Sequence, residues 1–146
     1  TVVSAARAAN AAMPAYAVSR AASLLGSLSG LRVAVLGAAY RGGVKETAFS
    51  GVFGVVSALR EAGVQVSVHD PLYSDDELAA FGWDAYHLGE PVDVAIIQAD
   101  HASYRDLVPA DLPGVCLLVD GRAITSPEAW AGTPRITIGG GASPAC

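Results

Sequence analysis

The feature that most constrains the fold of this chain is an ordered series of short apolar runs with helical patterns between them. Strands are expected over residues 32–37, 64–69, 92–98, 115–119 and 135–138. Runs rich in β-branched residues and separated by helices indicate a parallel sheet that is covered on both faces. The sequence therefore predicts a doubly wound, Rossmann-like α/β fold with about five parallel strands.

Helical patterns occupy the intervals between these runs. The stripe of a core-facing helix is formed by Val52, Val55, Val56 and Leu59. Ser50 is the expected N-cap of this helix, and Gly63 closes it. Shorter helices are expected over residues 75–81 and 102–107. In such a domain, ligands bind beyond the carboxyl ends of the strands, so the residues that follow each strand are the candidate site.

The first residues form a separate helix candidate, with a kink expected at Pro14. One side of it carries Val18, Ala21, Ala22 and Leu25. A helix that leads into a domain with little core of its own is expected to pack against something outside the chain. The predicted division is therefore a linking helix over residues 1–28 and an α/β domain over residues 29–146.

Composition narrows the class of protein. The 146 residues carry a net charge of −5, which argues against a nucleic-acid surface. No apolar stretch is long enough to cross a membrane, and the N-terminal residues lack the basic start of a secretion signal, so a cytoplasmic protein is expected. The two cysteines and the scattered histidines predict neither a disulfide framework nor a metal site, and Cys116 is expected to be a buried core residue.

Two arginines follow strands that lie far apart in the sequence. Arg41 comes after the first strand and Arg122 after the fourth, so both should reach the same edge of the sheet. Each guanidinium suits phosphate oxygens, and Tyr40 adds an aromatic face. These residues predict an anion site. The alternative is that both arginines are solvated or pair with carboxylates at the same edge.

The known phosphate-binding loops do not match this anion site. Gly37 is followed by Ala38, Ala39 and Tyr40 where the dinucleotide fingerprint needs further glycines, and Gly43 stands where a P-loop needs lysine. The loop after the first strand must therefore hold its ligand, if it has one, in another way.

Two further polar residues stand at strand ends. Asp70 occupies the place of a ribose-binding carboxylate, but a turn in which it bonds nearby backbone amides is favoured. His101 has no identifiable nucleophile beside it and is expected to cap the helix that follows. No catalytic set can be assembled from the sequence.

Several blocks together resemble the C-terminal domain of the UDP-glucose/GDP-mannose dehydrogenase family. They are "VAVLGAAYRGGVKETAFSG", "VQVSVHDPLYS", "VDVAIIQADHASY" and "VCLLVDGRAI", preceded by "AARAANAAMPAYAVS", which is similar to the end of the family's central helix. The resemblance runs from about Arg7 to Ile138. It implies a UDP-binding domain of an enzyme that oxidises the C6 alcohol of a nucleotide sugar to a carboxylate with NAD.

The resemblance also implies site residues and partners. Tyr40 and Arg41 fall on the family's aromatic-basic pair, and Arg122 falls on its substrate-contacting arginine. UDP or another nucleotide sugar would be the ligand, and the remaining domains of the parent enzyme would be partners, with a homodimer formed through the N-terminal helix. Which sugar is bound, and whether its base is uracil or guanine, stays open.

The chain departs from the family at two points. Ala48 replaces an arginine that reaches NAD in many members, and neither cysteine has the flanking residues of the family's thioester-forming cysteine. NAD is therefore expected to bind to a domain absent here, and this chain alone is not expected to be catalytic. A non-catalytic assembly module without tight nucleotide binding stays an alternative. A receiver domain is disfavoured because the only lysine, Lys45, follows the first strand.

Overall fold

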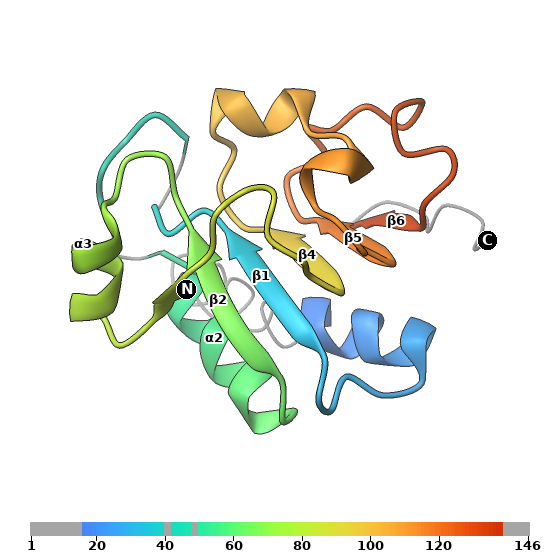
Figure 1. Ribbon diagram of the computed structural model, residues 1–146, viewed down its shortest axis with the longest axis horizontal. Helices are drawn as coiled ribbons and strands as arrows, with labels where there is room; N and C mark the ends of the chain where they lie inside the picture. The colour runs from blue at the N-terminus through green and yellow to red at the C-terminus, as the bar shows by residue number, and fades with distance from the viewer. Residues whose placement is uncertain (1–15, 40–41, 48–49, 139–146) are drawn as a thin grey trace, which may run out of the picture.

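A computed structural model describes residues 16–39, 42–47 and 50–138 of the chain. Six parallel strands form one sheet in the order β3-β2-β1-β4-β5-β6 (Figure 1). The strands are β1 (Arg32–Leu36), β2 (Gln65–His69), β3 (Asp84–Ala85), β4 (Val94–Ile97), β5 (Leu117–Asp120) and β6 (Arg135–Thr137). The predicted parallel α/β fold is confirmed. The additional strand, β3, has two residues and therefore no periodic pattern by which a sequence could reveal it.

The order of the strands places a topological switch at the centre of the sheet. From β1 the chain moves outward through β2 to β3, and it then returns to the other side of β1 as β4. Val35 of β1 pairs with Val68 on one side and with Ile96 on the other. The loops that leave β1 and β4 therefore diverge from a common point, which is where ligands bind in open α/β sheets.

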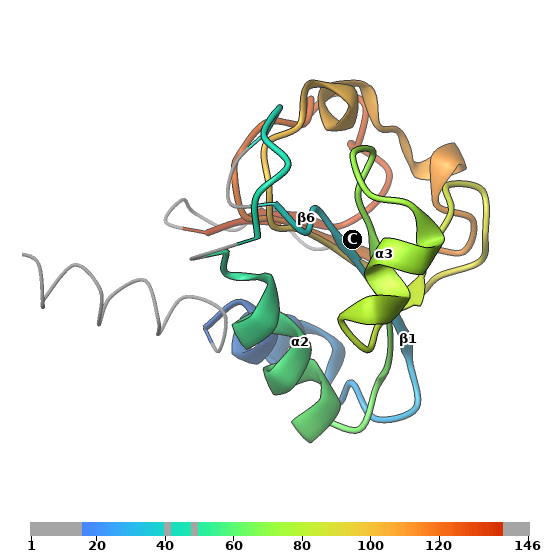
Figure 2. The same cartoon turned by 90° about the vertical axis from the view of Figure 1, so that its left-hand side faces the viewer.

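Each face of the sheet has its own core because side chains alternate along a strand. Val33 and Val35 of β1 belong to one core cluster, and Ala34 and Leu36 belong to the other. The first cluster is covered by α2 (Val52–Glu61) and by a helix over residues 16–25. Figure 2 shows both helices on the same side of the sheet.

The second face is covered by shorter elements. These are two 3-10 helices, η1 (Ala102–Asp106) and η2 (Pro109–Asp111). Tyr104 of η1 belongs to the second core cluster together with Leu107 and Trp130. The helix predicted over residues 102–107 is thus present, but in the tighter 3-10 form.

The helix over residues 16–25 packs against its own domain. Ala17, Val18 and Ala21 are buried in the same cluster as Val33 of the sheet. The expectation that this helix packs outside the chain is therefore wrong for that face. Residues 1–15 lie outside the described residues, and the boundary at residue 28 stays a prediction.

The starts of α3 and α2 compare differently with their predicted caps. Helix α3 (Asp75–Ala80) begins where predicted, with a capping box between Ser74 and Glu77. The N-cap of α2 is Gly51 and not Ser50, although the Ser50 hydroxyl still accepts a hydrogen bond from the Val52 amide at 3.2 Å.

Cys116 is exposed, and the prediction that it is buried is wrong. The apolar run begins before β5 does, so this residue lies ahead of the strand, with its Sγ 3.1 Å from the Asp93 carbonyl. Within the part of the chain that the structure describes, no helix is long and apolar enough to span a bilayer.

Candidate functional site

The switch point between β1 and β4 gathers most of the polar residues that the sequence places at strand ends. The loop from Gly37 to Gly51 that leaves β1, called the β1–α2 loop below, lies against residues that follow β2 and β4. Tyr40 and Arg41 belong to this loop but lie outside the described residues. The described part of the site consists of the other residues of this loop and the side chains that contact them.

Asp70 holds the start of the β1–α2 loop. Its Oδ2 accepts hydrogen bonds from the amides of Ala38 at 2.8 Å and Ala39 at 3.1 Å, and its Oδ1 accepts one from the Leu72 amide at 2.8 Å. The last bond confirms the predicted turn. The first two reach across the sheet to a neighbouring strand end, which the sequence did not indicate.

His101 joins Asp70 to the other end of the same short segment. Its Nε2 lies 2.8 Å from the Asp70 Oδ2, and its Nδ1 accepts a hydrogen bond from the Gly43 amide at 3.1 Å. Because Nδ1 is an acceptor here, Nε2 must carry the proton that is donated to Asp70. His101 does stand at the N-cap position of η1, but its side chain makes no capping bond there, so the predicted capping role is wrong.

Asp100 contacts Gly42, which lies between the loop residues that Asp70 and His101 bond. Its Oδ1 accepts a hydrogen bond from the Gly42 amide at 2.5 Å. This bond holds the pKa of Asp100 below its ordinary value, and the charge of Arg122 acts in the same direction. Only glycine fits at position 42, because a Cβ there would collide with the Asp100 carbonyl.

These contacts explain why the loop lacks the dinucleotide glycines. In glycine-rich phosphate loops, backbone amides point at the phosphate. Here the amides of Ala38, Ala39, Gly42 and Gly43 are bonded to protein side chains instead. An anion at this edge must therefore be recognised mainly by side chains.

Arg122 reaches the same edge from β5. Its Nε donates a hydrogen bond to the Gln98 carbonyl at 2.9 Å. The Gln98 side-chain amide in turn donates to the carbonyls of Gly37 at 2.8 Å and Ala39 at 3.2 Å. Gln98 is thus a direct bridge between Arg122 and the β1–α2 loop. Sequence reasoning missed Gln98, which is the last residue of an apolar run and carries no motif.

The turn that carries Arg122 is fixed by Asp120, a fully buried carboxylate. It accepts hydrogen bonds from the amides of Arg122, Ile124 and Thr125, from the Thr125 hydroxyl, and at 3.4 Å from Arg135. Asp120 thus binds the backbone amide of Arg122. It sets the backbone from which Arg122 projects.

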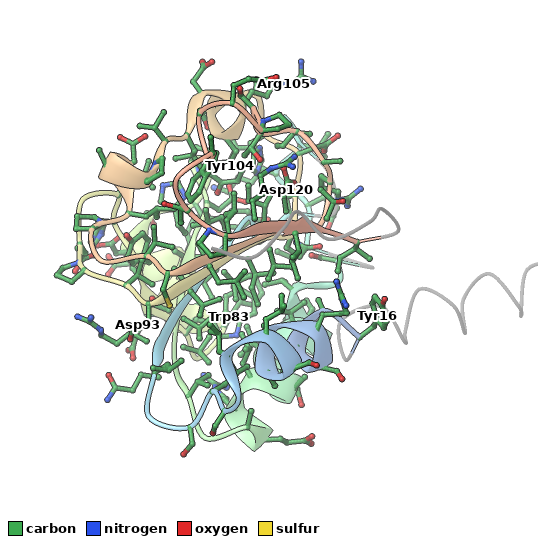
Figure 3. All side chains as sticks on the ribbon, turned by 90° about the vertical axis from the view of Figure 1, so that its right-hand side faces the viewer. Tyr16, Trp83, Asp93, Tyr104, Arg105 and Asp120 are labelled. Carbon is green, nitrogen blue, oxygen red and sulfur yellow. The ribbon has the colours of Figure 1, made fainter. Side chains whose placement is uncertain are left out.

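A buried tyrosine, Tyr104, bonds the partly buried His69 near the site. The Tyr104 hydroxyl is 2.8 Å from the His69 Nδ1 and donates to the His69 carbonyl at 3.1 Å. Burial lowers the pKa of His69, and burial raises the pKa of Tyr104. Figure 3 shows Tyr104 and Asp120 on the same side of the sheet, opposite Trp83. Both ionisable groups are kept neutral and serve the packing of this face.

One hollow on the surface does not belong to this site. This hollow of about 460 Å³ is lined by α2 residues together with Phe81 and Trp83, which follow α3, and none of the predicted site residues lines it. The α2 residues are Phe53, Val56, Ser57, Arg60 and Glu61. Across the described residues, no three histidine, cysteine or carboxylate side chains are grouped closely enough to hold a metal ion.

The fold and the strand-end residues define a Rossmann-like domain with an anion-suited switch point. Residues 34–127 match the family model of the UDP-glucose/GDP-mannose dehydrogenase family, UDP binding domain. The chain belongs to this family, and it corresponds to that domain.

Individual relatives agree with this membership. The chain is 27% identical over 139 residues to UDP-N-acetyl-D-mannosamine dehydrogenase of Methanocaldococcus jannaschii, covering 86% of this chain and 30% of the relative. A UDP-glucose dehydrogenase from Pyrobaculum islandicum is 30% identical with a TM-score of 0.64, over 77% of this chain and 26% of that one.

A third relative shares the fold at lower identity. NDP-N-acetyl-D-galactosaminuronic acid dehydrogenase of Methanosarcina mazei is 19% identical with a TM-score of 0.69, over 94% of this chain and 31% of the other. The chain thus spans less than a third of the length of these relatives.

Proposed function

We propose that this chain is the nucleotide-sugar-binding part of an NAD-dependent UDP-sugar 6-dehydrogenase, which oxidises the C6 alcohol of the sugar to a carboxylate. Tyr40, Arg41 and Arg122 contact the nucleotide. NAD and the catalytic cysteine belong to the remaining domains of the parent enzyme, so this chain alone binds but does not catalyse. The whole enzyme acts in the cytoplasm.

One observation carries this proposal. Arg122 is tied through Gln98 to the loop that leaves β1, although the two arise from strands separated by β4. A guanidinium at the switch point, beside a loop whose Ala38, Ala39, Gly42 and Gly43 amides are bonded to side chains, suits the oxygens of a diphosphate. Family membership names UDP as the nucleotide to test first.

Binding of UDP tests the proposal. A ligand that binds only the folded state stabilises it, so UDP at millimolar concentration should raise the melting temperature of the chain, and NAD should not. A folded chain whose melting temperature and calorimetric titration show no response to UDP would refute the proposal.

Arginine variants sharpen this test. Arg41→Ala and Arg122→Ala should each weaken UDP binding by about 1.5–3 kcal/mol, because each removes a charge-assisted hydrogen bond. Arg32→Ala is the matched control. Arg32 begins β1 at the opposite edge of the sheet and pairs with Asp93 at 3.2 Å, so its loss should leave UDP affinity unchanged.

We also propose that the parent enzyme is a homodimer that uses the N-terminal helix. Tyr16 and Leu24 support this, since they are large apolar side chains exposed on the helix over residues 16–25, whose other face is already in the core. Sedimentation of the full chain should show a dimer that Tyr16→Ser and Leu24→Ser together dissociate. A monomeric parent protein, or a dimer that tolerates both changes, would contradict this.

A further inference from the structure

We infer that Asp70 and His101 are positioning residues for the nucleotide, because together they fix the course of the β1–α2 loop on both sides of residues 40–41. This inference rests on the proposed function. It adds to that function two residues that do not touch the ligand and still set its affinity.

The first support is where these two side chains direct their hydrogen bonds. Asp70 and His101 are each 3% exposed and lie 2.8 Å apart. Removing such a pair from water costs free energy that its attraction need not recover. A gain in the stability of the fold is therefore not by itself the reason for burying it. Apart from the turn at Leu72, the bonds described for both side chains go to each other and to the β1–α2 loop.

The second support is the placement of those bonds along the loop. Asp70 holds the amides of Ala38 and Ala39, and His101 holds the amide of Gly43. The bonds therefore lie immediately before and shortly after residues 40–41. Since Asp70 also bonds His101, the two ends of the segment are tied into one network across the carboxyl ends of β1, β2 and β4.

The same hydrogen bonds distinguish Asp70 from a carboxylate that binds ribose. In a dinucleotide-binding fold, the carboxylate that ends the second strand binds a ribose hydroxyl. Here Oδ2 already accepts three hydrogen bonds and Oδ1 accepts one, all from the protein. Asp70 thus acts on the loop and not on the ligand.

The imidazole of His101 has two separable functions. Its Nε2 donates to Asp70, and its Nδ1 accepts from Gly43. Glutamine can replace the donor at the Nε2 position, and asparagine can place an acceptor near the Nδ1 position. His101→Gln should therefore keep the bond to Asp70 and release Gly43, and His101→Asn should do the reverse.

The test compares UDP affinity with stability in the full chain. Asp70→Asn, His101→Gln and His101→Asn should each fold at low temperature and raise the Kd for UDP. The rise should be about tenfold or more for Asp70→Asn and His101→Asn, the scale of a lost hydrogen bond to a charged group, and about two- to tenfold for His101→Gln, which loses a bond to a neutral acceptor. Trp130→Phe is the control for destabilisation alone. Trp130 lies in the second core and donates to the Leu107 carbonyl at 2.9 Å, so its loss should lower the melting temperature without changing the Kd.

Nitrogen NMR reads the two bonds of His101 directly, first in the unmodified chain and then in His101→Gln. The imidazole of His101 should show a protonated Nε2 and an unprotonated Nδ1 at neutral pH, and the Gly43 amide should lose its hydrogen-bonded shift in His101→Gln.

The outcomes separate the two proposals. If the unmodified chain does not bind UDP, the proposed function and this inference both fail. If it binds UDP and the three variants bind equally well, or if His101 is protonated at Nδ1, only the positioning role fails. A raised Kd in the three variants with an unchanged Kd in Trp130→Phe supports it.

Discussion

At the scale of single residues, Gly42 is required by the close approach of a neighbouring loop and not by its own turn. A Cβ at this position would meet the Asp100 carbonyl and the His101 amide. Gly42→Ala should therefore lower the free energy of unfolding by about 1–3 kcal/mol, since the backbone must move to make room. Gly132→Ala is the control, because a Cβ at position 132 meets nothing within 4 Å. Equal urea midpoints for the two variants would show that the approach is not this close.

Asp120 is the residue on which the turn carrying Arg122 most depends. Asp120→Ala leaves the buried Arg135 without its carboxylate and removes the acceptor for the amides of Ile124 and Thr125. We expect a loss of about 3–5 kcal/mol in unfolding free energy, the usual effect of breaking a buried ion pair. Asp106→Ala, at an exposed position of η1, should change it little. A small effect of Asp120→Ala in chemical denaturation would mean that the turn is held by other contacts.

At the scale of secondary-structure elements, the short helix α3 depends on its N-terminal cap. Ser74 and Glu77 bond each other's backbone amides, and α3 has only six residues. Ser74→Ala should therefore destabilise the chain by about 0.5–2 kcal/mol. Ser57→Ala, at an exposed position within α2, should be neutral or slightly stabilising because alanine is the better helix former. Thermal unfolding of the two variants makes the comparison, and equal melting temperatures would contradict it.

The β1–α2 loop should respond to acid through Asp100. The Gly42 amide and the charge of Arg122 hold the pKa of this carboxyl below the ordinary value of 3.8. The stabilisation is therefore complete above that ordinary value and is lost as the pH falls through the lower pKa of the folded state. The Gly42 amide resonance should shift with a midpoint below 3.8. A midpoint at or above this value, or an unchanged titration in Asp100→Asn, would contradict the assignment.

The elements of this chain differ in how far the sequence predicts them. The strand around Val33 and the stripe that ends at Leu59 were predicted correctly, because their periods follow directly from burial on one or two faces. β3 was not predicted, since two residues have no period. The prediction of a buried Cys116 is wrong because its apolar run begins before β5 does, and the residue ahead of the strand is exposed.

The site is less predictable than the fold for a related reason. Its contacts join residues far apart in the sequence, such as Gly42 with Asp100 across 58 positions and Asp70 with His101 across 31. Strand-end position alone indicated which residues share the edge of the sheet. It could not indicate that Asp70 and His101 bond the loop, or that Gln98 links this loop to Arg122.

At the scale of the whole molecule, two surfaces compete as the place where a ligand would bind. One is the switch point at the carboxyl ends of the strands, and the other is the hollow that includes Phe53, Phe81 and Trp83. The hollow is rich in aromatic side chains that could stack on a base. The switch point offers a guanidinium beside the side-chain-bonded amides of Gly42 and Gly43, which is the better match for a diphosphate.

Mapping amide shifts on addition of UDP distinguishes these surfaces directly. We predict that the largest changes occur at Gly37, Gly42, Gly43 and the residues around Gln98 and Arg122, and that they are lost in Arg122→Ala. Changes confined to Phe53, Phe81 and Trp83, or no change at any described residue, would contradict the claim that a nucleotide binds at the switch point.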